Sequence, residues 1–298
     1  MSDTRGLRLH QIIGYEYSPP NLLANGGFNI WQRGTSFTPA SGNLFNADEW
    51  TNYGSNSLVT YSREASVVKH GSYSMRMVVG VTSQTWQLRQ GIEHYEELEG
   101  LWLTFSVWVR CAGANQVYAG LSDHTAAGDE WAQSYYNKTA GAWEQLTVLK
   151  QIRNGQTTVA NRPHSFAVSA GIVGAVPSTT IYVSGATLVV GQYPEGVPYI
   201  PPESADDWER CQRFYEYGSA FLGHASTPTP ASATFVGELG FRTRKYSSPS
   251  LTGSVFTAGG GNFAGSTATA SAGVDGIQLS ISNSGDPGGT YAWEASVP

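Results

Sequence analysis

Aromatic and planar polar side chains gather between residues 86 and 135 of this 298-residue chain. They are Trp86, Arg89, Tyr118, Asp123, Trp131 and Tyr135. An aromatic ring can stack on the apolar face of a pyranose, and planar polar groups can hydrogen-bond the hydroxyls of the sugar. We expect these six residues to form a carbohydrate-binding site, although exposed aromatic side chains also serve contacts between subunits.

These side chains must be positioned by strands and by one loop. Trp86 and Arg89 fall in a segment with strand character, 85–92, and Tyr118 falls in another, 115–121. The polar stretch that contains Trp131 and Tyr135 is expected to be a loop. If the two strands are neighbours, the loop places its aromatic rings beside them.

Other kinds of chemistry find little support in the sequence. Gly26 and Gly27 belong neither to a GxGxxG pattern before a helix nor to a P-loop, so we expect them in a strand, at a bulge or a close approach of two backbones. Glu93, Glu96, Glu97 and Glu99 could supply the two carboxylates of a glycosidase, but a solvated turn explains them better. The chain also lacks the GxSxG pattern of a serine hydrolase. We expect no enzymatic activity.

Charge and cysteine content exclude further classes. The formal net charge is −6 and no run of basic residues is present, which disfavours nucleic acid as a partner. Cys111 and Cys211 lie far apart without a CxxC motif, so free buried thiols are favoured over a disulfide or a zinc site. No apolar run approaches the roughly 20 residues of a membrane span, and no signal peptide is visible. We therefore expect folding in a cytoplasm and no membrane insertion.

The fold class follows from short strands without long intervening helices. Strand character occurs at 22–31, 57–64, 73–81, 85–92, 101–110, 115–121, 143–151, 164–172 and 179–190. In the clearest of them, 101–110, one face is entirely apolar and the other is mixed. Residues 21–193 are thus expected to form an all-β, antiparallel jelly-roll sandwich.

Prolines and a change in composition mark the other parts. Residues 1–20 end in two prolines and are expected to be an arm. Residues 194–217 combine a proline-rich connector with a helix from Ser204, its expected N-cap, to about Tyr217. Trp208, Cys211, Phe214 and Tyr215 would share the packed face of that helix. Residues 218–298 are expected to form a second small β-sandwich, with strands at 233–243, 251–257, 276–282 and 290–296.

Several stretches resemble a known group of proteins. "NLLANGGFNIWQRG" at 21–34, "ADEW" at 47–50, "QLRQGIE" at 87–93 and "LTFSVWVR" at 103–110 resemble the carbohydrate-binding-module-like jelly roll of phage and prophage tail proteins. "YPEGVPYIPPESADDWERCQRFYEY" at 193–217 is similar to the connector and helix that follow this jelly roll, and "GFRTRKYSSPSLT" at 240–252 resembles part of their terminal domain.

The resemblance implies a structural protein of the virion, a component of a tail fibre, tail spike or head fibre that binds glycans on the host surface. Residues 1–20 would then dock on other virion proteins, and the assembly would be a homotrimer on the virion surface, made in the host cytoplasm. A purely structural decoration or connector protein that binds no sugar is the alternative, and a glycan depolymerase is a third possibility.

The resemblance also bears on the core and on metal binding. Trp31, Trp50 and Trp143 occupy framework positions of the jelly roll, so we expect them in the core. Jelly rolls of this kind often carry a structural calcium ion. Here Asn29 stands where an acidic residue is common, and 184–186 reads Ser-Gly-Ala where an aspartate would help. We therefore expect no cofactor.

Overall fold

The computed structural model describes residues 19–38, 45–53, 59–80, 86–92, 95–157, 167–172, 178–222, 234–242, 244–245, 250–258, 267–272, 275–282 and 289–296. The expected arm, 1–20, lies almost wholly outside these residues. The chain divides into two compact units. Ile30–Gly34, Ala47–Glu49 and Glu203–Pro298 make up the second unit, and the rest of the chain belongs to the first.

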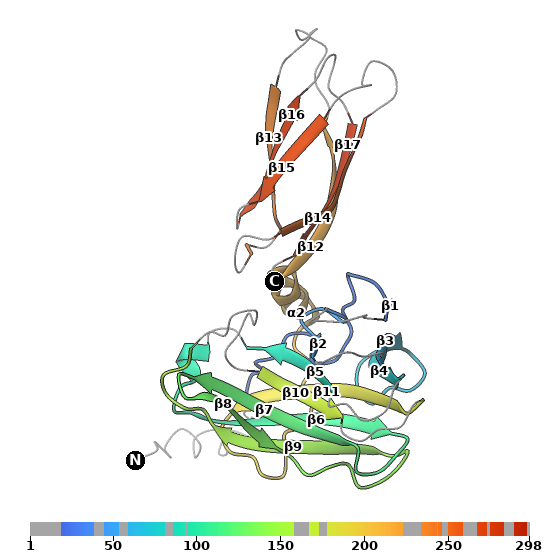
Figure 1. Ribbon diagram of the computed structural model, residues 1–298, viewed down its shortest axis with the longest axis vertical. Coiled ribbons are helices and arrows are strands. Elements are labelled where there is room, and N and C mark those ends of the chain that lie inside the picture. Colours follow the sequence, from blue (N-terminus) through green and yellow to red (C-terminus); the bar gives the residue numbers. More distant parts are fainter. Residues whose placement is uncertain are drawn as a thin grey trace, which may run out of the picture. The chain divides into compact units, whose positions relative to one another are not determined.

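Two antiparallel sheets form the first unit (Figure 1). The six-stranded sheet has the order β1 (Ser36–Phe37), β3 (Val59–Glu64), β4 (Ser74–Val79), β11 (Thr180–Val190), β6 (Trp102–Cys111) and β9 (Trp143–Gln151). The five-stranded sheet has the order β2 (Thr51–Tyr53), β5 (Trp86–Gly91), β10 (Ala167–Ile172), β7 (Val117–Thr125) and β8 (Gly128–Gln133). The expected all-β sandwich is confirmed.

The core lies between the two sheets and follows the alternation of the sequence. Leu103, Phe105 and Val107 of β6 are fully buried, and Val117 and Leu121 of β7 are fully buried as well. Each such side chain contributes roughly 1.5–3 kcal/mol when it is removed from water. The intervening residues Thr104, Ser106 and Trp108 lie on the other side of β6, where Thr104 and Ser106 are also buried and make hydrogen bonds with Gly191 and Val197.

The segment around Gly26 is not the expected strand. Asn25 and Phe28 adopt positive φ angles of 49° and 55°, so the chain turns here. The bulge lies instead in β11, where the register shifts between Ser184 and Thr187. A Cβ on Gly26 would overlap the carbonyl oxygen of Ala186 within that bulge. The expectation of a close approach between two backbones is therefore confirmed, whereas the strand assignment is wrong.

A strand occupies part of the expected loop after residue 121. β7 continues to Thr125, and β8 pairs with it through a short turn that ends at Gly128, whose φ is 98°. β8 is rich in polar residues such as Asp and Glu, which have low strand propensity, so the sequence did not predict this strand. They are tolerated because β8 is the edge of its sheet and is partly exposed.

The only α-helix among the described residues is α2 (Ser204–Gln212), in the second unit. It is shorter than expected, because β12 begins already at Tyr215, and its N-cap is Glu203 rather than Ser204. Cys211, Phe214 and Tyr215 are buried as expected, but Trp208 is 39% exposed. The spacing of the aromatic residues fits a longer helix, but Tyr215, the last of them, is the first residue of β12.

Two three-stranded antiparallel sheets complete the second unit, as expected of a small β-sandwich. One has the order β12 (Tyr215–Leu222), β17 (Gly289–Ser296) and β14 (Ser250–Ala258), and the other β13 (Thr234–Gly240), β16 (Gly276–Ser282) and β15 (Thr267–Ala272).

Three remaining sequence expectations concern thiols, membrane spans and glutamates. Cys111 and Cys211 are both free and buried, as expected, and burial raises the pKa of each thiol. In the part of the chain that the structure describes, no helix has the length and apolar character that a bilayer span requires. Glu96 and Glu97 lie exposed in a short 3-10 helix, η1 (Tyr95–Leu98), which agrees with a solvated position.

Candidate functional site

Three of the six residues expected in the site meet on the outer face of the five-stranded sheet. The register places Arg89 opposite Ser169, Ser169 opposite Gly120, and Trp131 opposite Ser122, so these residues share one face. The guanidinium carbon of Arg89 lies 4.5 Å from the centroid of the Trp131 ring. The structure thus brings together residues from β5, β7 and β8.

Tyr118 belongs to the same group. Its hydroxyl accepts a hydrogen bond of 3.0 Å from Gln87 Nε2, and Arg89 Nε donates to Gln87 Oε1. The ring lies close over β10, because a Cβ on Gly171 would overlap it. Tyr118 is only 1% exposed and Arg89 is 7% exposed. Burial is the main cause that raises the pKa of Tyr118. This cluster therefore supports the surface around it, and only the half-buried Trp131 reaches solvent.

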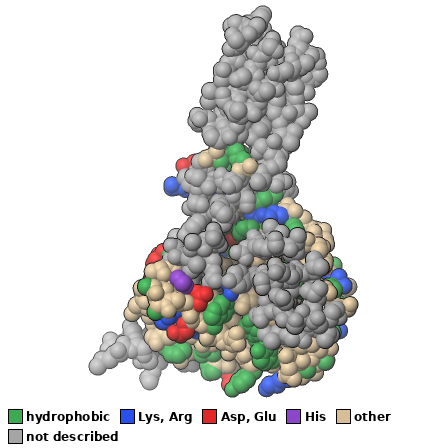
Figure 2. All heavy atoms as spheres, in the orientation of Figure 1, with side chains coloured by type: hydrophobic (Ala, Val, Ile, Leu, Met, Phe, Trp, Pro, Cys, Tyr) green, Lys and Arg blue, Asp and Glu red, His purple; other side chains and the backbone are tan. Residues whose placement is uncertain are grey.

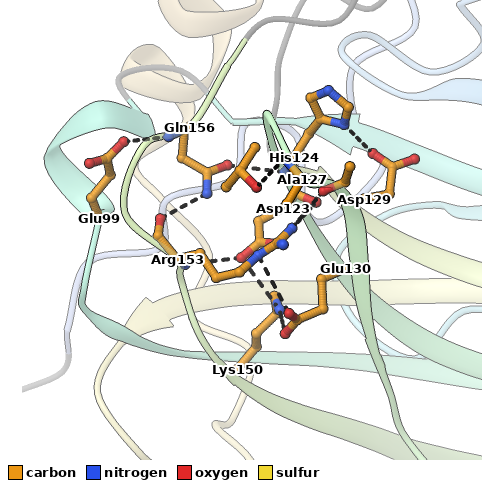
Figure 3. A network of polar contacts seen from close by, with 11 residues as sticks. Glu99, Asp123, His124, Ala127, Asp129, Glu130, Lys150, Arg153 and Gln156 are labelled. Atoms are coloured by element: carbon orange, nitrogen blue, oxygen red, sulfur yellow. Dashed lines mark hydrogen bonds and ion pairs between the residues drawn. The ribbon is translucent and has the colours of Figure 1, made fainter.

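Asp123 faces the other way, into a network of ion pairs (Figure 3). Its side chain is fully buried. Oδ1 accepts from Arg153 Nη2 at 2.6 Å and from Arg153 Nε at 2.8 Å, and Oδ2 accepts from the Arg153 backbone N–H at 3.0 Å. Lys150 Nζ lies 3.4 Å from Oδ2. Hydrogen bonding to Asp123 is the first cause that raises the pKa of Arg153.

The network joins the edge strands of the two sheets. Lys150 of β9 also donates to Glu130 of β8 at 2.6 Å, and His124 Nδ1 lies 2.7 Å from Asp129 Oδ1 in the β7–β8 hairpin (Figure 3). The described contacts of Asp123 give it a structural role. Its part in carbohydrate binding stays a prediction.

The last two residues expected in the site are Trp86 and Tyr135. The backbone of Trp86 lies in β5, but its side chain lies outside the described part of the structure. Tyr135 follows β8 and is 87% exposed. It lines an open groove of about 410 Å³ that no inference from the sequence had located.

Four aromatic side chains line this groove, together with polar groups. The lining residues are Trp108, Ser134, Tyr135, Tyr136, Lys138, Trp143, Glu144, Gln145, Leu146 and Thr147. Trp108 on β6 and Gln145 on β9 are register partners, so they lie side by side on the outer face of the six-stranded sheet. Such a combination of rings with amide, hydroxyl and charged groups suits a polar ligand that has apolar faces.

Backbone contacts hold the tyrosine segment in place. The N–H groups of Ser134 and Asn137 each donate a 2.9 Å hydrogen bond to β7, to the carbonyls of Ala119 and Val117. The Tyr136 ring meets the Tyr118 ring edge to face, with centroids 5.9 Å apart. The buried cluster around Tyr118 therefore supports one wall of the groove, which limits the ordering cost of binding.

Glu144 fixes the turn at the other end of the groove. Its Oε2 accepts a hydrogen bond of 2.8 Å from the Lys138 N–H, and its Oε1 accepts from the Thr139 N–H. The pKa of Glu144 lies below its ordinary value. Burial is the largest single influence and alone would raise this pKa, but the hydrogen bonds from Lys138 and Thr139 together outweigh burial. Glu144 is thus a charged, positioned residue that holds the backbone of the groove.

A partial signal for the groove is present in the sequence. Trp108 lies on the mixed face of 101–110, where an aromatic residue alternates with the apolar core positions. Trp143, by contrast, was expected in the core and is half-buried in the groove wall, because it begins the edge strand β9. Trp31 and Trp50 are buried, as expected.

The two positions considered for calcium make hydrogen bonds within the protein. Asn29 Oδ1 accepts from the Ser72 N–H at 2.9 Å, and Ser184 Oγ accepts from the His70 N–H at 3.1 Å. Among the described residues, no group of three or more His, Cys, Asp or Glu side chains could hold a metal ion.

No known family model matches the chain, and no curated protein matches it either. Solved structures do show likeness. The enzymatically active domain of tailspike protein 4 from bacteriophage CBA120 is 14% identical with a TM-score of 0.39, covering 57% of this chain and 21% of its own. The CBM22-1 xylan-binding domain from Paenibacillus barcinonensis Xyn10C is 8% identical with a TM-score of 0.39, covering 60% of this chain and 99% of its own.

A third similar structure is named as a cyclase rather than as a carbohydrate-binding or tailspike protein. The Stig cyclase Fisc from Fischerella sp. TAU is 10% identical with a TM-score of 0.38, and the match covers 58% of this chain and 98% of the cyclase chain. This chain spans only about a fifth of the tailspike chain. Likenesses of this size do not transfer a function, so the function has to be argued from the chain's own residues.

Proposed function

We propose that this protein binds carbohydrate, without catalysis, in the groove between residues 134–138 and β9. The observation that carries the proposal is the open groove of about 410 Å³ with Trp108, Tyr135, Tyr136 and Trp143 in its walls. These rings offer stacking surfaces to pyranose faces, and the Lys138 ammonium and the hydroxyls of Tyr135 and Tyr136 offer polar partners for sugar hydroxyl groups.

The virion is the proposed setting. The motifs at 21–34 and 193–217 that resemble phage and prophage tail proteins support a tail-fibre, tail-spike or head-fibre adhesin. In this proposal the protein is a homotrimer on the virion surface, attached to other virion proteins through residues 1–20, and it binds glycans on the host cell. Three grooves on one particle would increase the effective affinity of weak individual sites.

The proposal is tested with the full-length protein on a glycan array, followed by calorimetric titration of the best oligosaccharide. Tyr135→Ala and Trp143→Ala each remove one ring from the groove. We expect each to weaken binding about tenfold, which corresponds to about 1.4 kcal/mol and to the size of one aromatic stacking contact.

Trp208→Ala is the matched control, because Trp208 is an exposed tryptophan in α2 that does not line the groove. It should leave the affinity unchanged. Absence of binding to any glycan would contradict the proposal and favour the purely structural alternative. Binding that survives both groove substitutions would place the site elsewhere, with Trp131→Ala as the next variant to measure.

A further inference from the structure

The groove carries more positive than negative charge that a ligand can use. Lys138 lines it, and Lys69 Nζ lies 4.2 Å from the centroid of the Trp108 ring, which forms part of the wall. Both lysines are exposed. Within the described residues, neither ammonium group lies within 4.0 Å of a carboxylate.

Glu144 is the one acidic side chain among the residues that line the groove. Its two oxygens accept the backbone N–H groups of Lys138 and Thr139. A carboxylate committed to the backbone of a turn has few lone pairs left for sugar hydroxyls. The Glu144 oxygens therefore hold the turn while the carboxylate keeps its single negative charge, and the two ammonium groups of Lys69 and Lys138 outnumber it and keep hydrogen-bond donors for a ligand.

We infer, on the basis of the proposed function, that the groove selects saccharides with an anionic substituent over their neutral counterparts. A ring of such a saccharide can stack on the aromatic wall while its anionic group meets Lys69 or Lys138. Figure 2 shows the described Lys and Arg side chains scattered over the face that it draws, some of them beside Asp or Glu side chains.

The experiment compares matched ligands. Oligogalacturonate and the same oligomer after reduction of its carboxyl groups are titrated into the full-length protein, together with sulfated and unsulfated forms of one oligosaccharide. We expect the anionic member of a pair to bind about fivefold to tenfold more tightly, since each exposed ion pair gives only a small gain. The preference should shrink as salt is raised, because exposed charges are screened.

Lys69→Gln and Lys138→Gln should each weaken binding of the anionic member of a pair more than binding of its neutral member, and so reduce the preference. Arg63→Gln is the matched control, because its guanidinium carbon lies 4.4 Å from the centroid of the Tyr73 ring, away from the groove. It should leave the preference intact. A larger effect with carboxylated than with sulfated ligands would identify the anion.

Equal binding of the neutral and anionic members, with no effect of either lysine substitution, would overturn this inference and leave carbohydrate binding standing. Binding that depends on charge but survives Tyr135→Ala and Trp143→Ala would also overturn it, because the anion would then bind outside the groove. If no member of either pair binds and the glycan array is empty, both the inference and the proposed function fail.

Discussion

Arg33 lies over the ring of Tyr215, with its guanidinium carbon 4.0 Å from the ring centroid, and its Nη1 lies 3.7 Å from Asp48 Oδ1. These contacts join segments that are far apart in the sequence within the second unit. Burial is the first cause that lowers the pKa of Arg33 and raises that of Asp48, and the partner charge opposes both shifts. The stability of the second unit therefore depends on Arg33 and Asp48, which come before most of the first unit in the sequence.

Asp48→Asn should destabilise the second unit by about 3 kcal/mol, because it removes the carboxylate that lies 3.7 Å from Nη1 of the buried Arg33 guanidinium. Hydrogen exchange of a peptide covering 204–222 should accelerate by about 100-fold. Asp275→Asn is the control, since Asp275 pairs with Arg244 at 3.4 Å on the exposed surface. An equal effect of both substitutions would contradict the structural role of Arg33.

Gly26→Ala tests the close approach to β11. The new Cβ would overlap the carbonyl oxygen of Ala186, so the backbone has to shift at a cost of about 1–3 kcal/mol. The denaturant midpoint of the first unit should fall accordingly. At Gly240 a Cβ meets nothing within 4 Å, so Gly240→Ala should change stability little. A neutral Gly26→Ala would show that the segment does not pack on β11.

Asp123→Asn separates stability from binding. It leaves Arg153 and Lys150 without the carboxylate that both contact, so unfolding should become easier by about 3 kcal/mol. The protein that remains folded should bind glycan with unchanged affinity. Asp129→Asn removes one member of the exposed pair with His124 and is the matched control. It should change neither the free energy of unfolding nor the affinity for glycan. Loss of binding by folded Asp123→Asn protein would instead support the direct role that the sequence suggested.

His70 should make stability depend on pH. Burial, followed by the charge of Lys69, lowers its pKa from the ordinary value of 6.5. At a pH between the folded-state and the unfolded-state pKa of His70, the unfolded chain binds more protons than the folded protein. The contribution of His70 to stability is therefore present above about pH 6.5 and is lost as the pH falls through the folded-state pKa. The melting temperature of His70→Gln should fall less than that of the wild type between about pH 7.5 and about pH 5. Parallel pH profiles would rule the effect out.

The sequence predicted the fold class because alternation in segments such as 101–110 fixes which face is buried. It failed at β8, where polar residues occupy an exposed edge strand, and at the end of α2, where aromatic spacing fits both a helix and the start of a strand. The turn at Asn25 was missed because the hydrogen bond beside it, from the Ala186 N–H in β11 to the Gly26 carbonyl, joins segments that are distant in the sequence.

Of the six residues predicted for the candidate site, only Tyr135 is among those that line the groove. Arg89, Tyr118 and Trp131 do meet, because β10 pairs with both β5 and β7, β8 pairs with β7, and the register puts the three side chains on one face. Burial, however, depends on the packing around a whole sheet face, and no local pattern reveals that Tyr118 is enclosed while Tyr135 is exposed. The groove likewise needs Trp108 and Trp143 from two paired strands beside a segment that follows a third.

The most direct test of carbohydrate binding in the groove is fluorine NMR of the protein labelled with fluorotryptophan, titrated with the best oligosaccharide from the array. The chain has nine tryptophans, so each signal can be assigned by substitution. The account predicts that the signals of Trp108 and Trp143 shift while that of Trp208 stays in place. A shift confined to tryptophans outside the groove, or no shift at a saturating concentration, would contradict it.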